Sequence, residues 1–323
     1  MTPIAKNIQL AKCFQAFCSS TTVGALEKSM TTQFDCPQKY FRNSVELVHN
    51  NYFGSVTEDV LSEFMAIPAI DSITSFAQAE KKLEGLIAKI AKPGDKHSCL
   101  RDPRQLRKEV ETIQDPSAVS LSNESNNHHL VVKIENFLSQ NTAADFEAIV
   151  ASNREFIEAH KLVLDLRGNC GGYIDQVCQI LSSFANKPVE FGNILAYVDD
   201  RLEIVKVSVT TKHVKLCAPM GAPSSKTSIQ FLRKTEIESL NCPVEVWVDS
   251  QTRSAAEMLV TALKPLPNVK VIGTRTYGKG YMQQTLALGR GRALRLTSGI
   301  YRTPTNGELR DRGVSPHERR NWS

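Results

Sequence analysis

Three short segments of the 323-residue chain carry residue types that could do chemistry together. Residues 167–172, Arg-Gly-Asn-Cys-Gly-Gly, follow an apolar run, and backbone N–H groups in such a glycine-rich turn can hold a developing oxyanion. Ser254 lies at the start of a helical pattern, where a serine is either an N-cap or a nucleophile. Lys279 lies between two glycines, outside any nucleotide-binding P-loop spacing, and burial would let it serve as a general base.

The second half of the chain alternates short apolar runs with amphipathic helical patterns. Strands that alternate with helices over short loops indicate βαβ units and a mostly parallel sheet. Arg167, Ser254 and Lys279 each follow such a run, so parallel strands would bring their segments to one edge of the sheet. Residues 193–216 alternate in two stretches and predict a β-hairpin. Strands are expected at 130–134, 162–166, 244–248 and 269–272, and helices at 143–159, 174–185 and 254–263.

The first third of the chain has a helical pattern. Over residues 77–91, for example, Leu83, Leu86 and Ile90 recur on one face, as an amphipathic helix requires. Residues 104–128 are mainly polar and are interpreted as a linker of irregular structure. We therefore expect an N-terminal segment at 1–35, a helical N-terminal subdomain at 36–103, a polar linker at 104–128 and a core at 129–323.

Composition excludes several classes of protein. With 41% hydrophobic and 23% charged residues, the chain is neither collagen, nor a coiled coil, nor mostly disordered. No apolar run approaches the ~20 residues of a membrane helix, and the first 24 residues hold no signal-peptide pattern. The net charge of +5 is mild and does not predict a nucleic-acid partner. The eight cysteines show no metal-binding spacing and are interpreted as scattered reduced thiols.

Taken in order, four segments resemble the S41 family of serine peptidases, the tail-specific or C-terminal processing proteases. They read LVLDLRGNCGG, PVEVWVDSQTRSAAEMLVTAL, VIGTRTYGKGYMQ and LRLTSGIYRTPTNGELRDRGVSPH, and the resemblance spans about 131–317. In that family a serine before A-x-E is the nucleophile, and the lysine of T-[FY]-G-K-G is the general base. A glutamine four residues after the lysine orients it. The resemblance thus implies these roles for Ser254, Lys279 and Gln283.

The same resemblance implies a ClpP/crotonase-like core with flanking helices and no metal or organic cofactor. It also implies an oxyanion hole made by the N–H of Ala255 and that of a glycine, either Gly168 or Gly171. Family members usually carry a PDZ domain before the core. Fewer than 30 residues separate Arg101 from His129 here, which is too few for one.

A second candidate base comes from another part of the family. The stretch TRSAAEM is closer to the TASSAEM stretch of nisin-resistance-type S41 proteins than to the usual SASASE. In that subgroup, which also lacks a PDZ domain, and in tricorn-like peptidases, a histidine from the N-terminal part is the base. The matching stretch here is Gly-Asp-Lys-His-Ser at 94–98, which makes His97 the alternative to Lys279. The presence of Gln283 favours Lys279, and the choice stays open.

The residues and the resemblance together predict a serine endopeptidase. Ser254 would attack a peptide or protein substrate near its C-terminus and form an acyl-enzyme. One alternative is a catalytically silent binding module, like the retinoid-binding repeats that share this type of fold. Another is an acyl-CoA enzyme of the crotonase class, which needs the oxyanion geometry but no serine–lysine pair. The compartment and the oligomeric state stay open.

Overall fold

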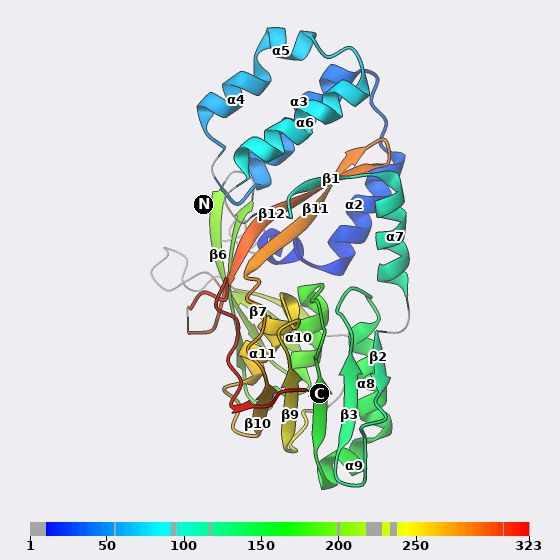
Figure 1. The fold of residues 1–323 in the computed structure, drawn as a ribbon, viewed down its shortest axis with the longest axis vertical. Coiled ribbons are helices and arrows are strands. Elements are labelled where there is room, and N and C mark those ends of the chain that lie inside the picture. The colour runs from blue at the N-terminus through cyan, green and yellow to red at the C-terminus, as the bar shows by residue number, and fades with distance from the viewer. Residues whose placement is uncertain are drawn as a thin grey trace.

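The structure is a computed structural model, and the chain forms an elongated molecule of two β-sheets with helices around them (Figure 1). One sheet lies at the end of the molecule opposite helices α3–α6, which span residues 37–90, and the second sheet lies between that sheet and these helices. The residues that the structure describes are 11–54, 56–91, 95, 97–115, 118–198, 201–217, 228–232, 238–305 and 307–322.

Within the described residues the first sheet has six strands, in the order β13-β10-β9-β4-β3-β2. Neighbouring strands are parallel from β13 to β3, and β2 is antiparallel. Every residue of β4 is buried, which is typical of parallel strands covered on both faces. All four predicted strands are present. The strand bounds are β2 (Val119–Leu121), β3 (Leu130–Ile134), β4 (Leu162–Asp165), β9 (Val244–Val248), β10 (Val269–Gly273) and β13 (Glu318–Arg319).

Helices pack against this sheet and share one hydrophobic core with it. Two of the predicted helices are present as α10 (Ile174–Ser182) and α11 (Ala255–Leu263). The single helix predicted at 143–159 is instead two, α8 (Thr142–Ser152) and α9 (Arg154–Ala159). The break falls at Asn153, whose φ of −122° and ψ of 18° are not helical, and asparagine favours such a cap over a helix interior.

The second sheet is antiparallel and has seven strands in the part of the chain that the structure describes. Its order is β1-β12-β5-β6-β7-β8, with β11 paired to β12. The hairpin predicted at 193–216 is present as β5 and β6, extended by β7. A mostly parallel sheet is therefore only half of the architecture, which is mixed α/β. The bounds are β1 (Cys99–Arg101), β5 (Val189–Val198), β6 (Arg201–Val209), β7 (His213–Cys217), β8 (Ser228–Leu232), β11 (Tyr281–Gly289) and β12 (Arg292–Arg302).

The N-terminal helices pack on the hairpin formed by β11 and β12. Leu288, Leu294 and Leu296 of this hairpin are buried in one cluster with the helical residues Phe41 and Leu83. The helical pattern predicted over residues 36–91 is confirmed, and the hydrophobic cluster of these helices is completed by the three leucines of the hairpin. Their bounds are α3 (Pro37–Asn51), α4 (Glu58–Met65), α5 (Ile67–Asp71) and α6 (Phe76–Ile90).

The stretch predicted as a polar linker at 104–128 is mostly regular structure. It holds α7 (Pro103–Gln114) and the edge strand β2. Helix α7 buries only Leu106 and Ile113, so its sequence is mainly polar and the apolar signal is weak. The N-terminal segment likewise forms α2 (Ser19–Thr31), which packs along β11.

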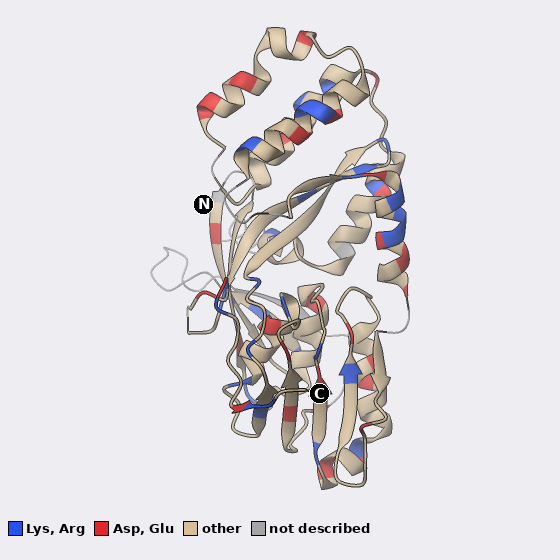
Figure 2. Ribbon diagram, in the orientation of Figure 1, with Lys and Arg blue, Asp and Glu red and all other residues tan. Residues whose placement is uncertain are grey.

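Charged residues are spread over the molecule. In the view of Figure 2, acidic and basic residues are interspersed along the helices and strands, in keeping with the mild net charge of +5. No helix within the described part of the chain is long and apolar enough to cross a membrane.

Candidate active site

The loops that follow β4, β9 and β10 lie side by side, as the sequence predicts. The three strands are neighbours and run parallel, so their carboxyl ends meet at one edge of the sheet. The loops are also joined directly: the Arg253 N–H donates to the Asn169 carbonyl (2.9 Å), and the Tyr277 N–H donates to the Thr252 carbonyl (3.0 Å). Backbone contacts thus hold three segments together: the glycine-rich turn (167–172), the serine loop (249–254) and the lysine loop (274–280).

A cavity of about 600 Å³ opens at this edge. Four of the predicted site residues line it: Ser254, Lys279, Gln283 and His97. The candidate nucleophile and both candidate bases, which come from distant parts of the sequence, therefore face one space. The other cavity-lining residues are Phe17, Cys99, Arg101, Leu138, Cys170, Gly172, Tyr173, Ile174, Arg253, Met258, Tyr277, Met282 and Arg295.

Ser254 has an unusual backbone conformation. Its φ of 59° and ψ of −126° lie where non-glycine residues rarely occur, whereas an ordinary N-cap residue is extended. Such strain is concentrated at functional sites, and a sharp turn between a strand and a helix is how many hydrolases expose a serine nucleophile. Gly171 packs against this turn: a Cβ atom on Gly171 would lie 2.7 Å from the Cβ of Ser254.

A buried carboxylate joins the serine loop to the lysine loop. Oε2 of Glu257 accepts hydrogen bonds from the backbone N–H of Ser254 (2.9 Å) and of Lys279 (2.8 Å). Oε1 accepts from the Gly278 N–H (2.6 Å) and from the Thr276 hydroxyl (2.5 Å). Glu257 is fully buried, so these four donors compensate its removal from water.

Lys279 is suited to act as a base because its ammonium form is disfavoured. Burial lowers the pKa of Lys279 to about 8, and the positive charges of Arg295 and Arg253 lower it too. The negative charge of Glu257 opposes them and raises this pKa. A substantial fraction of Lys279 is therefore neutral at slightly alkaline pH, the form that can accept the proton of Ser254.

His97 is held in the same cavity by an acidic turn. The carboxylate of Asp95 accepts hydrogen bonds from the backbone N–H groups of His97 (3.0 Å) and Ser98 (3.2 Å), and from the Thr297 hydroxyl (2.9 Å). Burial and then the positive charge of Lys279 lower the pKa of His97, although Asp95 raises it. His97 is therefore neutral near pH 7 and competent as a base. Gly94 and Lys96 of the predicted stretch lie outside the described residues.

Gln283 faces the cavity because strand β11 is irregular. Its pairing with β12 shifts register between Met282 and Gln283, and both residues line the cavity. In a regular strand consecutive side chains point to opposite faces. The Gln283 amide donates to the Thr297 hydroxyl (3.4 Å), which links it to Asp95 and the His97 turn. Within the described part of the chain no hydrogen bond joins Gln283 to Lys279, so its orienting role stays a prediction.

The two glycines expected to supply an oxyanion donor have their N–H groups occupied. The Gly168 N–H donates to Oδ1 of Asp249 (3.1 Å), and the Gly171 N–H donates to Oδ1 of Asn169 (2.8 Å). Across the described residues, the N–H groups of Cys170, Gly172 and Ala255 have no hydrogen-bond acceptor. Cys170 and Gly172 also line the cavity. Sequence reasoning missed these two donors, because the direction of an N–H depends on how the turn folds.

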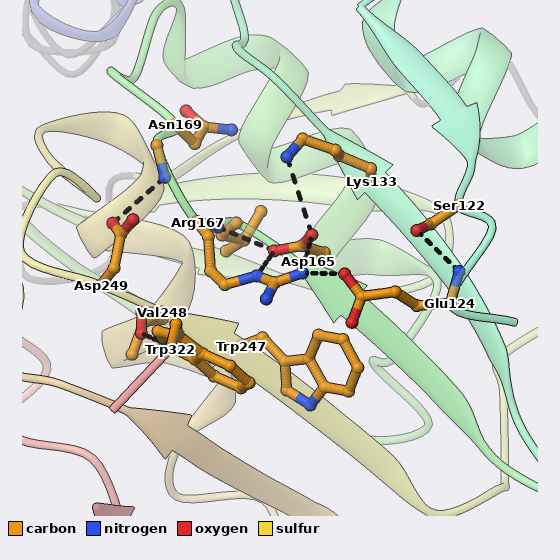
Figure 3. A network of polar contacts seen from close by, with 12 residues as sticks. Ser122, Glu124, Lys133, Asp165, Arg167, Asn169, Trp247, Val248, Asp249 and Trp322 are labelled. Atoms are coloured by element: carbon orange, nitrogen blue, oxygen red, sulfur yellow. Dashed lines mark hydrogen bonds and ion pairs between the residues drawn. The ribbon is translucent and has the colours of Figure 1, made fainter. Parts of the chain in front are cut away.

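An arginine anchors the start of the glycine-rich turn (Figure 3). Arg167 makes two hydrogen bonds of 2.8 Å to the buried carboxylate of Asp165 and one of 2.6 Å to Glu124. Its guanidinium also lies over the rings of Trp247 (4.9 Å) and Trp322 (4.6 Å). Asp165 and Arg167 thus support the turn on the side away from the cavity, and neither lines the cavity.

Comparison with known proteins identifies relatives of this chain. The family described as Peptidase family S41 matches residues 128–320. The carboxy-terminal processing protease CtpB of Bacillus subtilis (strain 168) is 29% identical over 239 residues, which are 73% of this chain and 42% of that protein. The nisin-resistance protein of Lactococcus lactis subsp. lactis is 25% identical over 284 residues, 87% of this chain and 82% of that protein. The chain thus spans less than half the length of the Bacillus relative.

A solved structure shares the fold. The structure of a lipoprotein from Streptococcus agalactiae has a TM-score of 0.61 and 18% identity, and the match covers 90% of this chain and 94% of that one. The family match covers more than half of the chain and includes the glycine-rich turn, Ser254 and Lys279. The chain belongs to peptidase family S41.

Proposed function

We propose that this chain is a serine peptidase that cleaves peptide or protein substrates near their C-termini. The observation that carries this proposal is the strained turn at Ser254, which lies in one cavity with Lys279, a half-buried lysine whose pKa is lowered to about 8. The names of relatives such as carboxy-terminal processing protease CtpB support cleavage near a chain end.

The reaction would proceed through an ester on Ser254. The serine hydroxyl attacks the substrate carbonyl, and Lys279 or His97 takes its proton. The N–H of Ala255, with an N–H from the turn at 168–172, would stabilise the oxyanion. The protonated base then gives its proton to the leaving amine, and a water molecule hydrolyses the ester. Gln283 would keep the base in position from β11.

We also infer a ClpP/crotonase-like core. The support is the set of parallel strands β3, β4, β9 and β10, whose loops at one edge present a glycine-rich turn and a helix N-terminus. The proposal also keeps the division into an N-terminal segment (1–35), a helical N-terminal subdomain (36–103), a polar linker (104–128), which holds most of α7 and β2, and an S41 peptidase core (129–323).

Labelling with a fluorophosphonate probe tests the function. We expect stoichiometric phosphonylation of Ser254, located by mass spectrometry of the digested protein, because such probes react with activated serines. Ser254→Ala should not be labelled, and Ser250→Ala is the matched control, since Ser250 is exposed in the same loop. An unlabelled wild-type protein would instead favour a silent binding module or an acyl-CoA enzyme.

The pH dependence of kcat/KM distinguishes the two candidate bases. If Lys279 is the base, kcat/KM rises with pH and levels off above an apparent pKa of about 8, because only neutral lysine accepts the proton. We expect this profile to persist in His97→Ala, and Lys279→Ala to lose about 10³-fold in kcat. If His97 is the base, the rise occurs below pH 6.5, because the pKa of His97 is lowered, and it disappears in His97→Ala.

A further inference from the structure

The cavity around Ser254 is strongly basic. Four cationic side chains line it, namely Arg101, Arg253, Lys279 and Arg295, and no acidic side chain among the described residues does so. In a cavity with low-dielectric walls, several charges of one sign add up to a potential that attracts the opposite charge. The cavity is thus suited to an anionic group of the substrate.

Two of these arginines have no ionic partner among the described residues. Arg295 donates to Oε1 of Glu109 (2.9 Å), which neutralises it. Arg101 and Arg253 form no ion pair with any residue that the structure describes, and the buried Nε of Arg101 has no hydrogen-bond partner. Within the described residues Arg101 and Arg253 therefore keep positive charges that a bound anion could compensate.

The three arginines come from different elements and converge on the reacting groups. Arg253 immediately precedes Ser254, and Arg295 lies on β12 directly opposite Cys99 of β1. Arg101 lies two residues further along β1, on the same face as Cys99. Arg253 and Arg295 lie near enough to Lys279 for their positive charges to lower its pKa. We call Arg101, Arg253 and Arg295 the arginine cluster.

We propose that the arginine cluster binds the terminal carboxylate of the peptide substrate, so that the chain end itself enters the cavity. This role rests on the proposed function of Ser254. A guanidinium binds a carboxylate through two parallel hydrogen bonds, and every peptide chain carries a carboxylate just beyond a scissile bond near its C-terminus. A volume of about 600 Å³ suits a short peptide segment. The released product is then a short C-terminal peptide.

Binding to Ser254→Ala tests this role without requiring turnover. N-acetylated random hexapeptides are prepared with a free C-terminal acid, with a C-terminal amide, and with a C-terminal amide after a final glutamate. Peptides retained with the protein on ultrafiltration are quantified by mass spectrometry. We expect the free acid to bind about ten- to a hundredfold more tightly than the amide, the effect of losing a charged hydrogen bond.

Equal affinity of acid and amide, or no retained free acid, would overturn the role. So would amidated peptides ending in glutamate that bind as tightly as the free acid, because the carboxylate would then come from a side chain. A different result would contradict the proposed function: if the wild-type protein binds the free acid preferentially but cleaves no peptide, it is not a peptidase. Wild type that cleaves acid and amide equally keeps the activity and loses the carboxylate site.

Variants of the arginine cluster sharpen the result. In the Ser254→Ala background, Arg101→Gln is expected to abolish most of the preference for the acid while leaving the affinity for the amide unchanged. Arg101→Lys should restore part of the preference, which a purely structural role would not predict. Arg107→Gln is the matched control, because Arg107 is exposed on α7 and outside the cavity. A preference that survives in Arg101→Gln and Arg253→Gln would overturn the assignment.

Discussion

Ser254→Ala is expected to lower kcat for peptide hydrolysis by about 10⁴- to 10⁶-fold, the usual cost of removing a serine nucleophile. Cys99 and Cys170 also line the cavity, but among the described residues neither thiol lies on the strained turn that presents Ser254. The free energy of unfolding should change by less than about 0.5 kcal/mol, because alanine keeps the Cβ atom and meets the same backbone strain. Product analysis of a peptide library by mass spectrometry measures the first effect, and urea denaturation the second.

Ser250→Ala should behave as wild type in both measurements. A Ser254→Ala protein that still cleaves the peptides cut by wild type would show that another group is the nucleophile. Loss of activity accompanied by unfolding would not support the proposed role of Ser254 either, because unfolding alone would explain the fall in rate. The proposed role therefore requires that activity is lost and the fold is kept.

Glu257→Gln is expected to have the second-largest effect, although Glu257 does not line the cavity. Each carboxylate oxygen accepts from at least one backbone N–H, those of Gly278 on one side and of Ser254 and Lys279 on the other. A glutamine amide would present an N–H₂ group to one of these donors in either orientation. We expect kcat to fall by about 10²-fold or more, and stability to fall by about 2–4 kcal/mol.

A shift in the pH profile separates positioning from simple destabilisation. The charge of Glu257 raises the pKa of Lys279, so its neutralisation should move the midpoint of kcat/KM below about 8. Residual activity is measured across pH at a temperature where the variant is fully folded. Glu111→Gln, on the exposed side of α7, serves as the control for loss of one carboxylate. An unchanged kcat and an unchanged midpoint would contradict this role.

The sequence predicted the part of the fold that depends on local pattern. The apolar runs at β3, β4, β9 and β10 are buried strands, and a run of this kind can be recognised without knowledge of its neighbours. Because parallel strands present their following loops at one edge, the meeting of Ser254 and Lys279 also followed from the order of the elements.

The remaining features depend on contacts between distant segments. Arg101, Arg253 and Arg295 are separated by more than 40 residues at the least, and no spacing rule joins them. The hydrogen bonds that occupy the N–H groups of Gly168 and Gly171 depend on the conformation of Asn169 and Asp249 in the folded turn. Helix α7 is a different case. Its capping box, Asp102 with Gln105, was a local signal for a helix start that the polar composition concealed.

The packing of the N-terminal helices on β11 and β12 bears on how the protein unfolds. Leu288, Leu294 and Leu296 are covered by α3 and α6, yet they belong to the same hairpin as Gln283. A fragment cut to residues 129–323 would expose these leucines as an apolar patch, which promotes aggregation. The helices and the core therefore stabilise each other. We expect them to unfold together with the loops around Ser254 and Lys279, in a single cooperative transition.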